Sequence, residues 1–189
     1  LQIPEGQLLM PTLETREACD PYEMRRFRDQ LLAVHDRILA LRIGGNDLMQ
    51  SMGLRRSPGS TAYDGPLGAV ISMLVTTFSP WGFALSAPVM ERFADTALLR
   101  REIACDIDHG LLTKTAIHPE QITVIQSALA VTELELAEAR LILDPAGPAV
   151  FAQSGVMCEP ATHRAWAERL IARADVFGTT SAVPLHRRA

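Results

Sequence analysis

The organisation of this chain is set by residues 37–48, which read Arg37-Ile38-Leu39-Ala40-Leu41-Arg42-Ile43-Gly44-Gly45-Asn46-Asp47-Leu48. Five of the first seven are apolar, all except Arg37 and Arg42, as expected of a strand buried in a parallel sheet. Two glycines then interrupt the run, and an acid, Asp47, follows. The pattern predicts a strand over 37–43 that carries a carboxylate at its C-terminal end.

A second stretch has the same form, because the apolar run of residues 7–13 is followed by Glu14. Glu14 and Asp47 are 47 − 14 = 33 residues apart, close to the roughly 30 residues that a strand–helix–strand unit needs. Neighbouring parallel strands lie about 4.8 Å apart. We therefore predict that both carboxylates leave the same edge of the sheet, where they can share one cation.

Composition narrows the class of protein. The chain has 189 residues, enough for about one domain with a sizeable core. Its net charge of 18 − 22 = −4 provides no basic excess for phosphates, so we expect no nucleic-acid partner. No apolar run approaches the roughly 18 residues of a membrane span, and no signal peptide is visible, so we expect no membrane partner.

Cysteine usage indicates the compartment. The three cysteines, Cys19, Cys105 and Cys158, are odd in number, widely spaced and without a C-x-x-C pair. This argues against a disulfide framework or a zinc site. We therefore predict a reducing, cytoplasmic location.

Strands and helices alternate along most of the chain. Apolar runs predict four strands, over 7–13, 37–43, 83–87 and 111–117. Helical patterns lie over about 21–34, 67–78, 95–109, 119–131, 132–144 and 160–177. The predicted N-caps are Asp20, Asp95 and Thr132, the last with Glu135 as a capping box. Residues 53–65 read as a long loop, which in a compact domain is functional or disordered.

This order predicts an α/β fold with a parallel sheet. A complete (β/α)8 barrel takes about 250 residues, so the chain suits the C-terminal half of a TIM barrel followed by extra helices. We divide it into a back half of the barrel, 1–131, a post-barrel helical extension of the same domain, 132–178, and a flexible tail, 179–189.

Several stretches match one family pattern in order. They are Glu14-Thr15, Gly44-Gly45-Asn46-Asp47-Leu48, Ala87-Pro88, Lys114–Ile122, Glu133–Leu143 with Glu138-Ala139-Arg140, and Met157 with Pro160 and Ala161. Together they resemble the HpcH/HpaI aldolase and citrate lyase β-subunit superfamily, and most closely its branch of C–C bond lyases of the TIM-barrel fold. The resemblance extends to about Gly178, and its most specific part is the Lys-x-x-Ile-His-Pro-x-Gln motif over Lys114–Gln121.

The resemblance implies a magnesium or manganese ion held by Glu14 and Asp47. It also implies an arginine on an early strand that holds the substrate carboxylate. That strand has no counterpart here, since the chain begins near the fifth strand of the family's barrel, so either the chain is a fragment or another polypeptide supplies the front half. The post-barrel helices would pack on a neighbouring subunit, giving a homo-oligomer. Thr113 departs from the glycine that the family commonly has before the lysine, and residues 86–91 differ from those of the citrate lyases, which leaves the substrate open.

The chemistry suits these residue types. Cleavage of a C–C bond beside a carbonyl leaves an enolate, whose charge a bound cation stabilises. Magnesium takes about six oxygen ligands and keeps several waters, so two carboxylates are enough. Gly44 and Gly45 would let the backbone approach the substrate, and Asn46 and Arg55 are candidates for binding it.

Each candidate also has a structural interpretation. Asp47 can be the N-cap of a short helix that ends near Met52, and Glu14 a solvated loop acid. The loop arginines Arg55 and Arg56 can clamp a carboxylate or phosphate, or lie on a solvated face. Glu91, which follows the third strand, is a second-tier candidate.

Two further residues are candidate catalytic groups. Lys114 can be catalytic, including as a Schiff-base lysine, or a structural ion-pair partner beneath the site. His118 can be an acid–base group, or a histidine that caps the turn before Pro119.

The leading hypothesis is a magnesium-dependent C–C bond lyase or aldolase that acts on a small oxo-acid or its CoA thioester. One alternative is an acyl-CoA thioester hydrolase on the same scaffold. Another is a non-catalytic barrel protein for binding or assembly. A metal-free Schiff-base aldolase would depend on Lys114.

Overall fold

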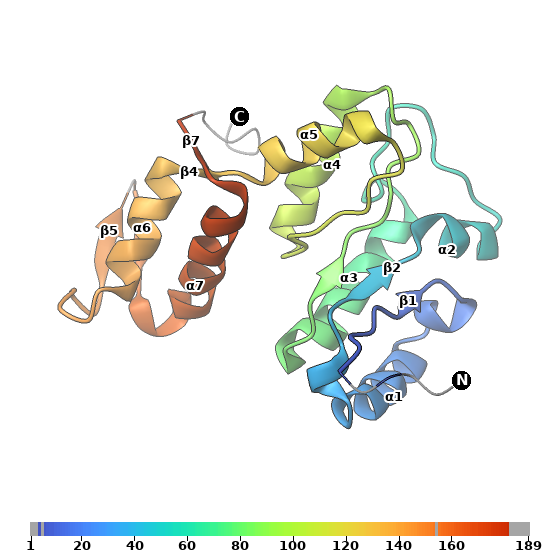
Figure 1. Ribbon diagram of the computed structural model, residues 1–189, viewed down its shortest axis with the longest axis horizontal. Helices are drawn as coiled ribbons and strands as arrows, with labels where there is room; N and C mark the ends of the chain where they lie inside the picture. Colours follow the sequence, from blue (N-terminus) through green and yellow to red (C-terminus); the bar gives the residue numbers. More distant parts are fainter. Residues whose placement is uncertain (1–3, 5, 154, 182–189) are drawn as a thin grey trace. The chain divides into compact units, whose positions relative to one another are not determined.

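The computed structural model describes residues 4, 6–153 and 155–181, and it forms two compact units, Leu1–Ile125 and Gln126–Ala189 (Figure 1). The predicted division after residue 131 stays a prediction. Most of the predicted tail, 179–189, lies outside the described residues.

The first unit contains a parallel sheet in the order β1 (Thr12–Leu13), β2 (Leu41–Ile43) and β3 (Leu85–Ser86). Isolated parallel bridges extend it, from Leu9 to Ile38 and from Ala87 to Lys114. The fourth predicted strand, 111–117, is reduced to that single bridge. Four parallel strand segments nevertheless alternate with helices, and the predicted fold class is confirmed.

The first strand is shorter than the predicted run of 7–13 because Pro11 lacks an N–H and cannot donate to the ladder. Its carbonyl still accepts from the N–H of Arg42 at 2.9 Å. The register then aligns Leu13 with Ile43, and Gly44 N donates to Leu13 O at 3.0 Å. This register places the ends of β1 and β2 at the same edge of the sheet.

Helices connect the strands of this unit (Figure 1). They are α1 (Pro21–Leu32), α2 (Gly45–Ser51), α3 (Pro66–Phe78) and α4 (Thr96–Asp108), with the short 3-10 turns η1 (Arg16–Cys19), η2 (His35–Arg37) and η3 (Ser79–Trp81). Two predicted N-caps are confirmed, since Asp20 accepts from Tyr22 N at 2.8 Å and Asp95 from Leu98 N at 3.0 Å. Helix α5 (Pro119–Leu129) crosses the boundary between the units.

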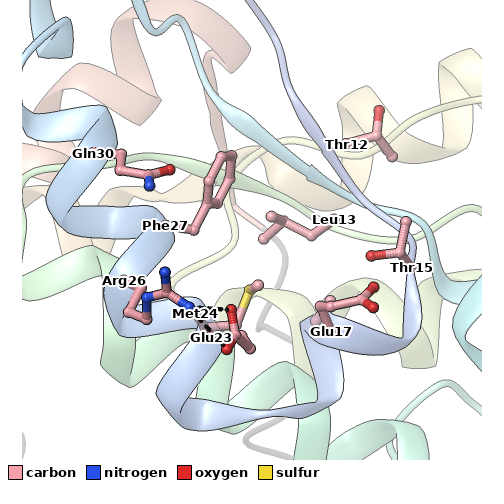
Figure 2. Close-up of a pocket in the computed structure, with 10 residues that line it drawn as sticks. Thr12, Leu13, Thr15, Glu17, Glu23, Met24, Arg26, Phe27 and Gln30 are labelled. Carbon is pink, nitrogen blue, oxygen red and sulfur yellow. Dashed lines mark hydrogen bonds and ion pairs between the residues drawn. The ribbon is translucent and has the colours of Figure 1, made fainter.

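One face of the sheet packs on helices and forms the core. Strand residues of this face are Leu13, Leu41, Ile43, Leu85 and Ala87, and they pack with Met24, Leu31, Leu67, Ile71, Leu74 and Phe78. Figure 2 shows Leu13 directed toward Phe27 of α1, while Thr12 points the other way. Successive strand side chains alternate between faces, so Thr12, Arg42 and Ser86, which are aligned in register, lie on the face opposite this core.

The second unit is a helical pair with short strands. Its elements after α5 are β4 (Val131–Thr132), α6 (Glu133–Leu143), β5 (Phe151–Gln153), β6 (Val156–Cys158), α7 (Pro160–Phe177) and β7 (Thr179–Thr180). The predicted capping box is confirmed: Thr132 Oγ1 accepts from Glu135 N at 3.1 Å, and the Glu135 carboxylate accepts from Thr132 N. The antiparallel β5–β6 pair and the parallel β4–β7 pair were not predicted.

Among the residues that the structure describes, none of the helices combines the length and the apolar character required to span a membrane.

Candidate functional site

Two glycines join the three strand ends. Gly44 packs on Glu14 so closely that a Cβ at residue 44 would overlap the Glu14 Cβ and lie 3.3 Å from its Oε2. A Cβ on Gly45 would stand 2.7 Å from the Cβ of Pro88, which follows β3, and 3.2 Å from Leu67 of α3. Both positions therefore need glycine for close approach, and they bring the ends of β1, β2 and β3 together.

Both predicted metal ligands are exposed at this edge. Glu14 directly follows β1, and Asp47 lies in the first turn of α2, which begins at Gly45 with Gly44 as its N-cap. The alternative that Asp47 is itself the N-cap is therefore wrong. Within the described ranges, neither carboxylate has a hydrogen bond or ion pair to another side chain.

The donor set suits a hard cation. Two unpaired carboxylates beside a glycine-lined turn fit a magnesium ion that keeps several waters. The described part of the chain contains no group of three or more His, Cys, Asp or Glu residues that could hold a metal, so any ion here would have few protein ligands. The assignment of Glu14 and Asp47 as metal ligands stays a prediction.

A pocket of about 270 Å³ adjoins the end of β1 (Figure 2). It is lined from β1, η1 and α1 by Thr12, Leu13, Thr15, Glu17, Ala18, Glu23, Met24, Arg26, Phe27 and Gln30. A hydrogen bond from the Thr15 hydroxyl, together with a backbone N–H and Arg16, lowers the pKa of the exposed Glu17 to about 2. The Arg26 guanidinium is paired with Glu23 at 3.2 Å, so this pocket offers no free cation among its described lining residues.

The predicted loop lies between α2 and α3 and lines a second pocket, of about 210 Å³. Arg55, Ser57 and Ser60 contribute to its wall. Arg55 and Asn46 are both exposed, which leaves their side chains accessible to a ligand. Their roles in substrate binding stay predictions.

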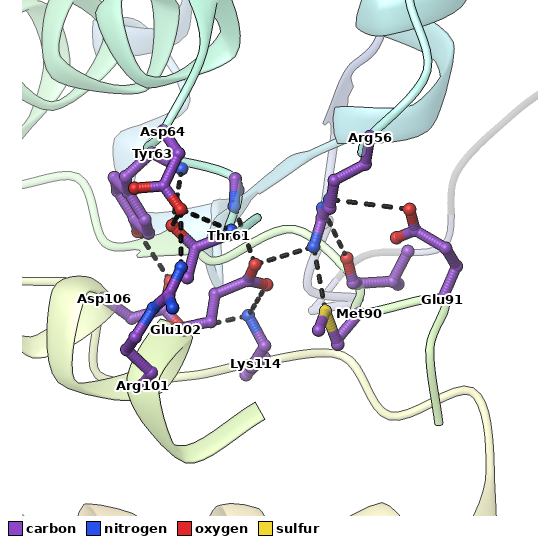
Figure 3. A network of polar contacts seen from close by, with 12 residues as sticks. Arg56, Thr61, Tyr63, Asp64, Met90, Glu91, Arg101, Glu102, Asp106 and Lys114 are labelled. Atoms are coloured by element: carbon purple, nitrogen blue, oxygen red, sulfur yellow. Dashed lines mark hydrogen bonds and ion pairs between the residues drawn. The ribbon is translucent and has the colours of Figure 1, made fainter. Parts of the chain in front are cut away.

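Arg56, by contrast, is buried, so the solvated-face interpretation is wrong for this residue. Its Nη1 donates to Glu102 Oε2 at 2.6 Å and its Nη2 to Val89 O at 3.3 Å. Its Nε lies 3.5 Å from Glu91 Oε1. Figure 3 shows the Arg56 guanidinium between these two carboxylates. Arg56 thus ties the long loop to α4 and to the segment after β3.

Lys114 lies in the same buried cluster (Figure 3). Its Nζ is 2.9 Å from Glu102 Oε1 and 2.9 Å from Asp106 Oδ2. Tyr63 of the loop donates its hydroxyl to Asp106 Oδ1 at 2.6 Å. This geometry is that of the structural ion-pair partner. A catalytic role for Lys114 stays a prediction, and a Schiff base would require its amine to leave both carboxylates.

Burial dominates the electrostatics of the cluster. It raises the pKa of Asp106, while the Lys114 ammonium opposes that shift. Burial, followed by the negative charge of Asp106, raises the pKa of Tyr63 well above its ordinary value. Tyr63 therefore remains a neutral hydrogen-bond donor, and the loop stays attached to α4.

Sequence reasoning missed Glu102 and Asp106. Both occupy the buried stripe of α4, spaced with Leu99 and Ile103 in the i, i+3, i+4, i+7 pattern of a core-facing helix. An acid in such a stripe signals a buried partner, because an unpaired buried charge is costly. The only lysine of the chain, Lys114, was the available signal.

His118 forms local contacts. Its ring stacks on Phe93 with centroids 4.5 Å apart, and its Nδ1 accepts from Glu120 N at 3.3 Å. These contacts suit a histidine that caps the turn before α5. Its acid–base role stays a prediction.

The parallel strands, the glycine-lined strand ends and the two free acids agree with the family suggested by the sequence. A family model described as the C–C bond lyase of the TIM-barrel fold matches residues 2–179, and the chain belongs to this family.

Individual relatives extend this picture. The chain is 29% identical over 112 residues to a (3S)-malyl-CoA thioesterase from Cereibacter sphaeroides, an alignment that covers 58% of this chain and 38% of that protein. It is similar to the crystal structure of CitE from Mycobacterium tuberculosis in complex with magnesium, acetoacetate and coenzyme A, with 25% identity and a TM-score of 0.67 over 90% of this chain and 62% of that one.

A citrate lyase from Burkholderia xenovorans LB400 has the same fold, with 23% identity and a TM-score of 0.69 over 97% of this chain and 57% of the other. The chain thus spans less than two thirds of the length of these relatives.

Proposed function

We propose that this protein is a magnesium-dependent C–C bond lyase that acts on a small oxo-acid or its CoA thioester. The observation that carries the proposal is the pair Glu14 and Asp47, two exposed carboxylates without a protein partner in the described residues, at adjacent parallel strand ends. Membership of the C–C bond lyase family supports it. The magnesium, acetoacetate and coenzyme A in the complex of the related CitE support the choice of cation and substrate class.

The residues at the strand ends have separate tasks in this proposal. Glu14 and Asp47 hold the cation, which when bound supplies the positive charge that stabilises an enolate. Gly44 and Gly45 have no side chains, so the substrate can approach the backbone closely at these positions. Asn46 and, from the long loop, Arg55 bind polar groups of the substrate.

Product analysis of the full-length protein tests the proposal. Small oxo-acids and their CoA thioesters are incubated with magnesium and, separately, with a chelator. We expect C–C cleavage products that disappear with the chelator and return when magnesium is restored. Cleavage that persists in chelator, or an absence of cleavage across the panel, contradicts the proposal.

The malyl-CoA thioesterase relative favours a second candidate, hydrolysis of an acyl-CoA thioester on the same scaffold. Water would then be the nucleophile, and the carbon skeleton would stay intact. Free CoA thiol together with an uncleaved acid identifies this reaction, whereas a lyase releases two carbon fragments.

We also propose a homo-oligomer in which the second unit contributes to the subunit interface. Several large apolar side chains of this unit are exposed, among them Leu134, Leu141, Met157, Trp166 and Val176. In this proposal the interface buries these apolar side chains as one contiguous patch. Light scattering at micromolar concentration tests this proposal, and a monomer contradicts it.

A further inference from the structure

Glu91 differs from every other residue of the described chain that has a buried polar side-chain atom without a hydrogen-bond partner. The other such atoms are arginine Nε atoms, in Arg37, Arg42, Arg56 and Arg173, and Glu91 Oε2 is the only oxygen among them. The Glu91 side chain as a whole is 30% exposed. A partly buried carboxylate oxygen without a donor is costly to the fold, and a catalytic role is one of the few reasons for keeping such a group.

The contact with Arg56 leaves the Glu91 carboxylate chemically unused. Glu91 Oε1 lies 3.5 Å from Arg56 Nε, and this Nε counts as an atom without a hydrogen bond. The charge of Arg56 is met elsewhere, because its Nη1 donates to Glu102 Oε2 at 2.6 Å. Figure 3 shows one oxygen of Glu91 facing Arg56 and the other without a contact among the residues drawn. The carboxylate can therefore accept a donor from a ligand.

The backbone that carries Glu91 is held firmly. Arg56 Nη2 donates to Val89 O at 3.3 Å, and Gln121 Nε2 donates to Met90 O at 2.8 Å. Met90 itself is 0% exposed. The terminal torsion of a glutamate side chain is broad, so the carboxylate can turn while the backbone stays fixed. A proton acceptor in catalysis needs this combination of a fixed position and a free carboxylate.

Glu91 also lies on the side of the sheet where the proposed cation site lies. It follows the last residue of β3 by five residues, and Pro88 of the same segment packs on Gly45, which precedes Asp47 by two residues. Because β1, β2 and β3 are parallel, the segments that follow them leave the sheet at one edge. The segment 88–91 therefore borders the strand ends at which we place the cation.

We propose that Glu91 is the general base of the lyase and takes the proton from a hydroxyl group of the substrate. The substrate class is then an acid or thioester with a hydroxyl on the carbon that separates from the enolate. When the O–H bond breaks, its electron pair forms the new C=O bond. The pair of the C–C bond becomes the enolate, and the proton stays on Glu91. The inference rests on the proposed function, since it assigns the base for that reaction.

Paired substrates separate the base from the rest of the site. Malyl-CoA and the aldol of pyruvate with acetaldehyde must lose a hydroxyl proton. Malonyl-CoA and oxaloacetate reach the same two enolates by loss of CO2 and need no base. The full-length protein is assayed with magnesium, and rates are corrected for a blank without protein. We expect Glu91→Gln to lose about a hundredfold or more in kcat/KM for the hydroxy substrates and to keep its decarboxylation rates.

Glu120→Gln is the matched control, because Glu120 is an acid in the first turn of α5 whose side chain is 73% exposed. It should keep both reactions. The Tm of Glu91→Gln should stay close to that of the unmodified protein, since Arg56 retains Glu102. A variant that does not fold, or that loses both reactions equally, shows that Glu91 is structural and overturns the inference.

The outcomes for the proposed function are distinct. Cleavage of the hydroxy substrates that is unchanged in Glu91→Gln keeps the lyase and rejects Glu91 as its base. An unmodified protein that processes none of the four substrates rejects the lyase, and the role of Glu91 is rejected with it.

Discussion

The first unit contains two pairs of acidic residues that differ in burial and in their side-chain partners. Glu102 and Asp106 are 0% and 1% exposed and meet Arg56, Lys114 and Tyr63 at 2.6–2.9 Å. Glu14 and Asp47 are exposed and form no hydrogen bond or ion pair with a side chain in the described residues. The buried pair is thus neutralised by the protein itself, whereas the exposed pair is available to a cation from solvent.

The difference shows which acids the fold needs. A buried carboxylate is tolerated only when cations and hydrogen bonds compensate its lost hydration. An exposed carboxylate retains water and costs the fold little. We infer that the buried pair holds the loops in place and that the exposed pair serves ligand binding, and four substitutions can break or sharpen this division.

Glu102→Ala should have the largest effect on stability. It removes the one carboxylate that Arg56 and Lys114 share, leaving Arg56 with only the partly exposed Glu91 and Lys114 with only Asp106, which costs about 3–5 kcal/mol in the free energy of unfolding. Urea unfolding measures the loss. The control Glu23→Ala removes one exposed ion pair on α1 and should cost less than about 1 kcal/mol. Equal losses in the two variants would contradict the division.

Asp47→Ala should have the converse effect. Because Asp47 supports no other side chain, the fold should keep its Tm, while magnesium binding is abolished and kcat/KM falls on the order of a hundredfold or more. Calorimetry and steady-state kinetics measure these changes. Asp36→Ala, an exposed aspartate in η2 before the opposite end of β2, is the control. Unchanged magnesium affinity in Asp47→Ala refutes the metal assignment.

Gly44→Ala should affect both stability and metal binding, because the new Cβ would overlap Glu14. We expect a loss of about 1–3 kcal/mol in unfolding free energy from the forced shift, together with weaker magnesium binding as Glu14 moves. Gly65→Ala is the matched control, since a Cβ there meets nothing within 4 Å. Magnesium binding that survives Gly44→Ala intact would show that the position of Glu14 is unimportant.

Arg101→Ala should have the smallest effect. Arg101 pairs with Asp64 at 2.7 Å and donates to Gly59 O at 2.8 Å, but both charged side chains are about half exposed. Exposed pairs contribute about 0–1 kcal/mol. Urea unfolding of this variant therefore tests whether burial, rather than the mere presence of a tether between α4 and the loop, determines the stability of the loop. A loss as large as that of Glu102→Ala would reject burial as the cause.

Local sequence signals predicted much of the fold. The apolar runs located the strands, and the caps Asp20, Asp95 and Thr132 located helix starts, because a cap acts over two or three residues. The pairing of residues 7–13 with 37–43 followed from spacing alone. The apolar pattern alone predicted a strand over the whole of 7–13. The observed strand is shorter because Pro11 has no N–H to donate to the ladder, which a pattern of apolar residues does not reveal.

Local sequence signals could not predict the buried cluster of Arg56, Glu102, Asp106 and Lys114. Arg56 and Glu102 are 46 residues apart, and nothing local distinguishes a buried acid on a helix from a solvated one. Arg56 was accordingly considered for a solvated face, and Lys114 was left between catalysis and structure. The proposed site could be predicted because Glu14 directly follows β1 and Asp47 lies in the first turn of the helix that follows β2, and the carboxyl ends of parallel strands meet at one edge.

The burial of Lys114 has a practical consequence. It is the only lysine of the chain, and its side chain is 2% exposed and bound to two acids. Reagents that acylate or cross-link lysine amines should therefore spare this side chain in the native protein and label it once the cluster around α4 opens. Acylation of Lys114, followed by mass spectrometry, thus offers a selective report of local unfolding.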